Sequence, residues 1–110
     1  MKKQNTNIPE YQIWDLKNAI SEFIEPRLKA YIKKVDDNEL VSIPTWVENK
    51  PDIDEQVLRK TWSSILKDML FPFDFQINPD NYISLADEEI LLRKEKGLQL
   101  FANYFEHLWD

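Results

Sequence analysis

Two carboxylates, Glu22 and Glu25, have the residue type and spacing in this sequence that best suit acid–base catalysis. Residues three apart are neighbours on a helix surface, so the two carboxylates could face one ligand and act as an acid and a base. The same spacing also suits ion pairing with a nearby base such as Lys29, which is the simpler interpretation. We therefore expect a solvated helix face, with an enzyme that uses an unrecognised carboxylate site as an alternative.

The only histidine, His107, cannot build a metal site of a familiar kind. A catalytic zinc site usually takes several His or Cys ligands, and the chain has no cysteine. A di-iron site in a helical bundle needs two Glu-x-x-His motifs, which one histidine cannot supply. His107 also falls off the apolar side of its helix, so we expect a solvated surface residue.

The segment 78–89 resembles a calcium-binding loop only at positions 1, 3 and 12. Tyr82 and Ile83 occupy the positions where such a loop needs a ligand and a glycine, so we expect an ordinary turn followed by a helix.

One glycine excludes the glycine-rich phosphate motifs, and Ser63–Ser64 lies mid-helix rather than on a strained turn. The sequence thus predicts no catalytic residue, no metal, no cofactor and no small-molecule ligand, and hence no enzyme.

The distribution of charge argues against nucleic acid as the partner. The net charge is −6, with +3 over residues 1–35, −4 over 36–53 and −5 over the remainder. The densest basic stretch contains Arg27, Lys29, Lys33 and Lys34, which diverge around a helix and form no track for phosphates. A nucleic-acid-associated accessory protein that uses Arg27, Lys33 and Lys34 is a second alternative.

Amphipathic periodicity predicts a flexible tail over residues 1–8 and one helical domain over residues 9–110. Three helices are joined by loops at residues 36–53 and 74–84, where proline, asparagine and aspartate interrupt the pattern. Apolar stripes on three helices can leave water only by packing against one another. The expected fold is therefore all-α, a three-helix bundle with a kinked first helix and two long loops.

The helix boundaries follow from prolines and capping residues. Pro26 interrupts the first helix without changing the phase of its stripe, which predicts a bend. The second helix begins at Asp52 or Asp54, and Pro72 kinks or ends it. The third begins at Ser84 or Asp87, with acidic residues in its first turn that suit the helix dipole.

The apolar stripes supply the expected core. The first covers half of its helix surface. The three stripes contain Ile13, Leu16, Ile20, Phe23, Ile24, Leu28, Tyr31, Ile32 and Val35; Leu58, Trp62, Ile65, Leu66, Met69 and Phe73; and Ile90, Leu91, Leu98, Phe101, Tyr104, Phe105, Leu108 and Trp109. The single glycine, Gly97, lies at the edge of the third stripe and costs about 1 kcal/mol of helix stability relative to alanine. Either a close contact with another helix requires this glycine, or the position has no structural requirement for it.

Motifs in all three helices resemble a family of small proteins from tailed bacteriophages and prophages. The first is W-x-L-x-x-x-I-x-x-F-I-x-P-R-L-K at residues 14–29, the second W-x-x-I-L-x-x-M at 62–69, and the third G-L-x-L-F-x-x-Y-F-x-x-L-W at 97–109. These positions are mostly core residues, so the resemblance implies a fold and an origin and implies no activity. The chain departs from the family pattern in the middle loop, which lacks a glycine, and at Pro72, where the family helix is uninterrupted.

Four large apolar residues lie outside the stripes and form the predicted interaction surface. They are Trp46, Phe71, Leu92 and Leu100. Either the long loops fold over them, or they contact a protein partner or a second copy. With no signal peptide and no membrane-span-length apolar run, we expect a cytoplasmic protein of the host cell or a virion-associated one. The expected function is a non-enzymatic interaction or accessory protein of phage or prophage origin.

Overall fold

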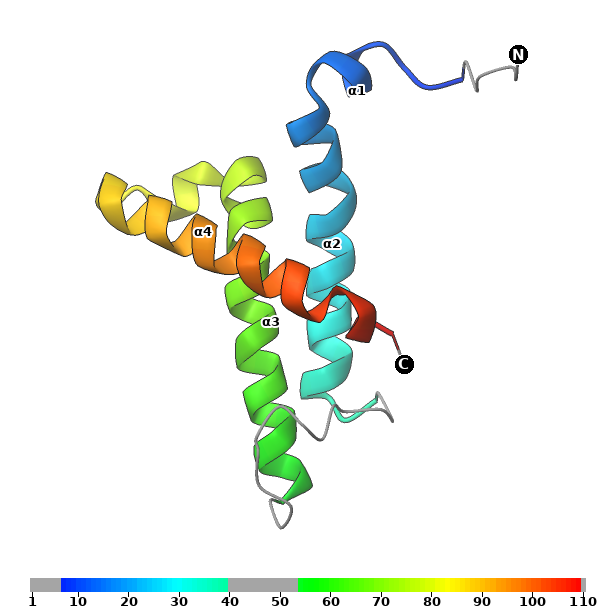
Figure 1. Ribbon diagram of the computed structural model, residues 1–110, viewed down its shortest axis with the longest axis vertical. Helices are drawn as coiled ribbons and strands as arrows, with labels where there is room; N and C mark the ends of the chain where they lie inside the picture. The colour runs from blue at the N-terminus through cyan, green and yellow to red at the C-terminus, as the bar shows by residue number, and fades with distance from the viewer. Residues whose placement is uncertain (1–6, 40–53, 110) are drawn as a thin grey trace.

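The chain folds as three main helices, with α2 and α3 side by side and α4 across them (Figure 1). The computed structural model describes residues 7–39 and 54–109, and it has no strand within these ranges. Its elements are α1 (Tyr11–Trp14), α2 (Leu16–Asp36), α3 (Glu55–Ile77), η2 (Pro79–Tyr82), α4 (Asp87–Tyr104) and η3 (Phe105–His107). The all-α prediction is confirmed. Most of the predicted tail, most of the first loop and Trp46 lie outside the described residues.

The first predicted helix is broken at Asp15 rather than at its proline. Asp15 has φ −124° and ψ 57°, which separates the short α1 from α2. α2 then runs through Pro26 without interruption. It ends in a Schellman motif, in which Asn38 takes the left-handed conformation (φ 60°) and the Glu39 N–H donates to the Lys34 carbonyl.

The second predicted helix is longer than the proline suggested. The carboxylate of Asp54 accepts a hydrogen bond from the Gln56 N–H at 2.8 Å, which confirms Asp54 as the N-cap. α3 passes through Pro72 and ends only at Ile77. With η2 following at once, the predicted loop over 74–84 is wrong for most of its length.

The start of α4 also differs from the expected one. Asp87 is the first helical residue, and Ala86 is the N-cap, without a side-chain hydrogen bond. Neither Ser84 nor Asp87 therefore caps the helix. Asp87, Glu88 and Glu89 do fill its first turn, where their charge complements the positive end of the helix dipole.

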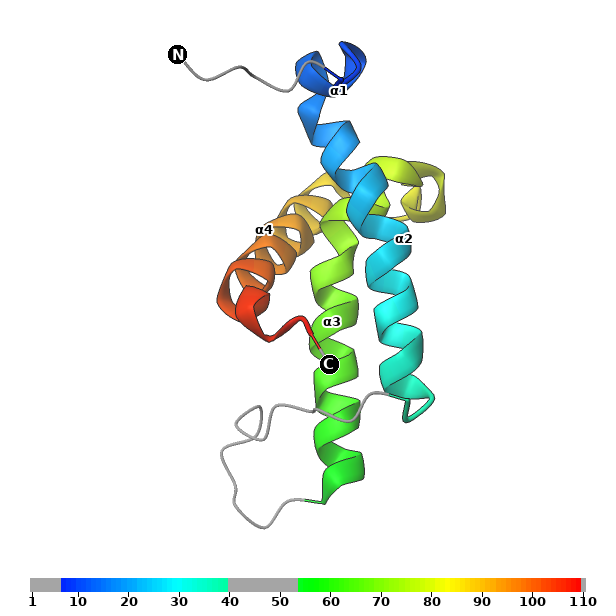
Figure 2. The same ribbon diagram turned by 90° about the vertical axis from the view of Figure 1, so that its right-hand side faces the viewer.

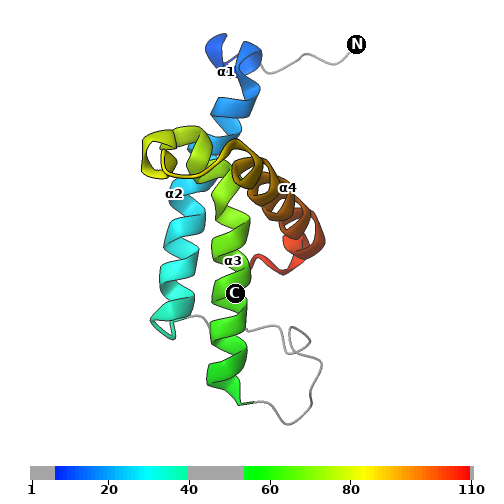
Figure 3. The same cartoon turned by 90° about the vertical axis from the view of Figure 1, so that its left-hand side faces the viewer.

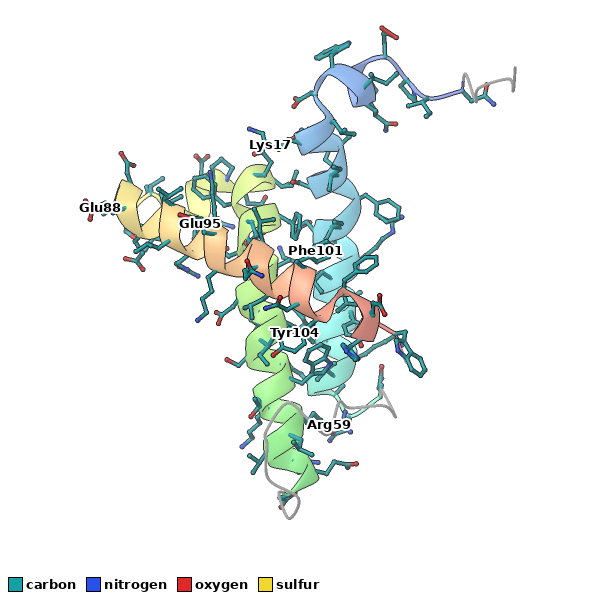
Figure 4. All side chains as sticks on the ribbon, viewed as in Figure 1. Lys17, Arg59, Glu88, Glu95, Phe101 and Tyr104 are labelled. Carbon is teal, nitrogen blue, oxygen red and sulfur yellow. The ribbon has the colours of Figure 1, made fainter. Side chains whose placement is uncertain are left out.

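The core lies where the C-terminal half of α2 packs against the middle of α3. It consists of Leu28, Ile32 and Val35 from α2 and Trp62, Leu66 and Met69 from α3. α4 covers one face of this pair (Figures 2 and 3) and adds half-buried side chains, among them Phe101 and Tyr104. The Tyr104 ring meets the Trp62 ring edge to face at 5.7 Å, and Figure 4 shows the position of Tyr104 on α4. Each fully buried large apolar side chain stabilises the fold by about 1.5–3 kcal/mol.

The crossing of α4 over α3 depends on Gly97. A Cβ built on Gly97 would lie 2.7 Å from the Asp68 carbonyl oxygen and 2.9 Å from Pro72 Cγ, closer than real Cβ atoms approach. Pro72 has no N–H to donate to the Asp68 carbonyl, four residues back, so that oxygen is free of the usual helical hydrogen bond. The backbone of α4 at Gly97 therefore packs against α3 at the point where Pro72 removes one helical hydrogen bond.

We expect Gly97→Ala to lower the free energy of unfolding by about 2 kcal/mol, because the added methyl group forces the helices apart. The gain of about 1 kcal/mol in helix propensity is too small to offset this strain. Urea denaturation followed by circular dichroism measures the change. Glu95→Ala, at an exposed position of the same helix, is the control and should stay within about 0.5 kcal/mol of wild type. A Gly97→Ala protein as stable as the control would contradict the close crossing.

Candidate interaction surface

The strongest cluster of titratable groups surrounds the buried carboxylate of Asp74 on α3. One oxygen accepts from the Tyr82 hydroxyl, and the other accepts from Asn78 Nδ2 at 2.8 Å and lies 3.2 Å from Lys29 Nζ. Lys29 also pairs with Glu25, one turn earlier on α2. The cluster joins α2, α3 and η2 through polar contacts that satisfy both oxygens of the carboxylate. It is the arrangement of a structural network rather than of an open catalytic site.

The pKa values in this cluster follow from burial and from these partners. Burial by itself raises the pKa of Asp74, but Tyr82, Asn78 and Lys29 together hold that pKa below its ordinary value. Burial and the adjacent Asp74 carboxylate raise the pKa of Tyr82 to about 12. The Glu25 and Asp74 carboxylates raise the pKa of Lys29. At neutral pH the cluster therefore holds an ionised carboxylate, a neutral phenol and an ammonium group.

The other residues singled out from the sequence are distributed over the surface. Glu25 pairs with Lys29, as the simpler interpretation predicted, whereas Glu22 is exposed. His107 is half-buried in η3, where its carbonyl accepts from the Tyr31 hydroxyl at 3.4 Å. In the described ranges no group of three or more His, Asp or Glu side chains could hold a metal ion.

Two of the three basic residues proposed for nucleic acid form ion pairs within the protein. Lys33 Nζ lies 2.6 Å from the Asp37 carboxylate, and Lys34 Nζ lies 3.5 Å from that of Glu39. Arg27 stacks on the Phe23 ring at 3.9 Å. No observation here favours a phosphate track.

Over residues 7–39 and 54–109, no helix has the length and hydropathy that crossing a bilayer requires.

Of the four residues predicted as an interaction surface, the three that the structure describes do not form a shared exposed patch. Phe71 is buried (2% exposed) beneath the Tyr82 ring and the Arg93 guanidinium, so it contributes nothing to the surface. Leu100 packs half-buried against the core, and Leu92 is exposed on α4. Trp46 lies outside the described residues. Phe71 is covered by η2 and α4, which the sequence interpretation could not place because it read residues 74–84 as a loop.

Six other large apolar side chains that were expected in the core are exposed, with exposed fractions of 43–60%. They are Leu16, Ile20 and Phe23 on α2, Leu91 and Leu98 on α4, and Phe105 on η3. We call these six residues the apolar band. Leu91 and Leu98 are seven positions apart, which places both on one side of α4. The sequence held a signal for the band, because the first stripe covers half a helix surface, more than one neighbouring helix can bury.

The two halves of the band meet across grooves between the helices. The central groove has a volume of about 440 Å³, and its apolar lining includes Phe23, Ile24, Phe101, Phe105 and Leu108. A second groove joins Ile20 to Leu98, and a third continues along α2 from Phe23 to Leu16 and Ile8. Figure 4 shows Phe101, which lines the central groove, on α4. Five of the six band residues therefore line connected grooves, and Leu91 lies two turns before Leu98 on the same side of α4.

The end of the chain closes one side of the central groove. The Tyr31 hydroxyl on α2 donates to the Trp109 carbonyl at 3.0 Å. Phe101 stacks edge to face on Phe73 and on Phe105, which links η3 to the α3–α4 contact. These contacts give the groove a fixed shape on a surface built by regular helices.

Comparison with models of known protein families, with curated proteins and with solved structures gives no match.

We expect Tyr82→Phe to destabilise the protein by about 1–2 kcal/mol at neutral pH, because a buried carboxylate loses one donor. The pKa of Tyr82 is raised from 10.0 to about 12 on folding, so the stability this phenol contributes is complete below pH 10 and is lost as the pH rises to 12. The difference between wild type and variant in urea denaturation should therefore shrink between pH 10 and 12. A difference that stays constant over that range would show that Tyr82 does not donate to Asp74.

Proposed function

We propose that this chain is a non-enzymatic interaction protein of phage or prophage origin, and that the apolar band is the surface it presents to a protein partner. The observation that carries the proposal is the exposure of six large apolar side chains, five of which line connected grooves. Such side chains gain about 25 cal/mol for each Å² removed from water, so an uncovered band favours association.

The size of the band supports this assignment. If a fully exposed large side chain offers about 200 Å², the six exposed fractions correspond to roughly 650 Å² of apolar surface. The largest apolar patch on a typical monomer is about 300–600 Å² and is often functional, and a stable interface buries about 800 Å² on each partner. With a polar rim, the band therefore matches one side of a standard interface.

The phage or prophage origin rests on the resemblance of the three helix motifs. Trp62, Met69 and Gly97 of those motifs lie at buried helix contacts, whereas other motif residues, such as Phe23 and Phe105, are exposed and belong to the apolar band. The genes that flank the coding sequence test this part of the proposal. Phage structural or replication genes on either side are expected, and a neighbourhood of housekeeping genes alone would contradict the origin.

We expect a photoreactive phenylalanine analogue at position 23 to cross-link the chain to a protein in the cells that carry the gene. The side chain of Phe23 is 60% exposed between two of the grooves, where a partner would cover it. Ile20→Glu in the same chain should abolish the adduct, because it puts a charge into the contact. Denaturing gels and mass spectrometry give the adduct mass, for a foreign partner or for a second copy of 13.2 kDa.

The matched control carries the same analogue at Leu92, which is 66% exposed and points roughly 100° away from Leu91 around α4. It should give no adduct. Absence of any adduct at position 23, or an adduct that survives Ile20→Glu, would overturn the proposed function.

A further inference from the structure

The charged side chains that line the three grooves are all basic. They are Lys17, Arg27 and Lys94, and none of them forms an ion pair with a carboxylate in the part of the chain described. This is unexpected in a chain with a net charge of −6. Outside the grooves, five lysines (29, 33, 34, 67 and 96) and Arg59 have carboxylate partners, whereas Lys60 and Arg93 form no ion pair among the described residues. The band therefore combines apolar surface with cations that lack a counter-charge.

Aromatic rings hold two of these cations at the grooves. Arg27 lies 3.9 Å from the centre of the Phe23 ring, and its guanidinium donates to the Phe23 carbonyl at 2.9 Å. Lys94 Nζ lies 4.6 Å from the centre of the Phe75 ring. A ring positions a cation without neutralising it, so the charge stays available to a partner.

We infer that the partner is an acidic amphipathic helix, whose apolar face lies in the central groove and whose carboxylates reach Arg27 and Lys17. This inference rests on the proposed function and adds the chemistry of the partner. A helix laid in an apolar groove is a recurrent mode of recognition, and here the groove lies between α2 and the end of α4. Arg27 lines the central groove and Lys17 lines the second groove. The two are about 15 Å apart along the α2 axis and about 80° apart around it, which suits carboxylates two to three turns apart along one edge of the partner helix.

A second copy of the chain fits this surface less well. A twofold contact places the same patch on both sides of the interface, so Lys17, Arg27 and Lys94 of one copy would approach the same three cations of the other. Like charges brought together at an interface oppose association. A partner of opposite charge has no such cost.

Two synthetic peptides of about 18 residues test the inference, both with leucines at helical spacing along one face. One carries glutamate along the edges of that face, and the other carries lysine at the same positions. Fluorescence anisotropy at low salt should show the acidic peptide binding about tenfold more tightly, against the direction that the net charge of the whole chain favours. Arg27→Glu should remove most of that preference.

Lys60→Glu is the matched control, because it makes the same charge change at an exposed position of α3 outside the three grooves. It should leave the preference intact, and circular dichroism checks that both variants fold. The inference fails if neither peptide binds, if the two bind equally, if the lysine peptide binds more tightly, or if both variants lose the preference alike. It also fails if the chain sediments as a dimer that the acidic peptide does not dissociate. In each of these cases a cross-link at position 23 would still support the proposed function.

Discussion

The close approach of α4 to α3 at Gly97 and Pro72 sets the position of every later part of the chain. The glycine lets the two backbones meet, and the proline leaves the Asp68 carbonyl open at the meeting point. From this crossing, the C-terminal half of α4 runs over the core, where Phe101 meets Phe73 and Tyr104 meets Trp62. A bulkier residue at position 97 would move all of these contacts at once.

The same crossing determines which apolar side chains remain uncovered. α3 receives α2 on one side and α4 on another, so its apolar stripe is well buried, with Trp62, Leu66 and Met69 fully shielded. α2 and α4 each use one side against α3 and keep a second apolar side, which faces the grooves between them. α1 and the first residues of α2 extend beyond the crossing, where Trp14 and Leu16 are exposed (Figures 1 and 2). The apolar band is exposed because α2 and α4 both pack against α3, which covers only part of the broad apolar stripe on each.

Polar groups reinforce this arrangement away from the band. The Asp74 cluster ties η2 and α2 to α3, and the Ser63 hydroxyl donates to the Asp36 carboxylate at 2.6 Å near the other end of the helix pair. Both contacts satisfy buried polar atoms inside the protein. The three cations at the grooves form no ion pair with a carboxylate of the described residues, which supports the proposal that the band meets another protein.

The sequence by itself determined the helical class and the core of α3, because periodicity depends on residues a few positions apart. It favoured the pairing of Glu25 with Lys29 and narrowed the cap of α3 to Asp52 or Asp54, of which the structure shows Asp54. It could not determine that α3 continues through Pro72 or that Phe71 is covered by Tyr82 and Arg93, since both depend on segments that only folding brings together. Whether Gly97 is required by a close helix contact also depended on the tertiary structure, which places it against Asp68 and Pro72. The band is the clearest case: the sequence showed that Ile20, Phe23 and Phe105 are apolar and in phase with the core residues. Only the tertiary structure decided that they face solvent, because one helix can cover only part of a stripe that spans half a helix surface.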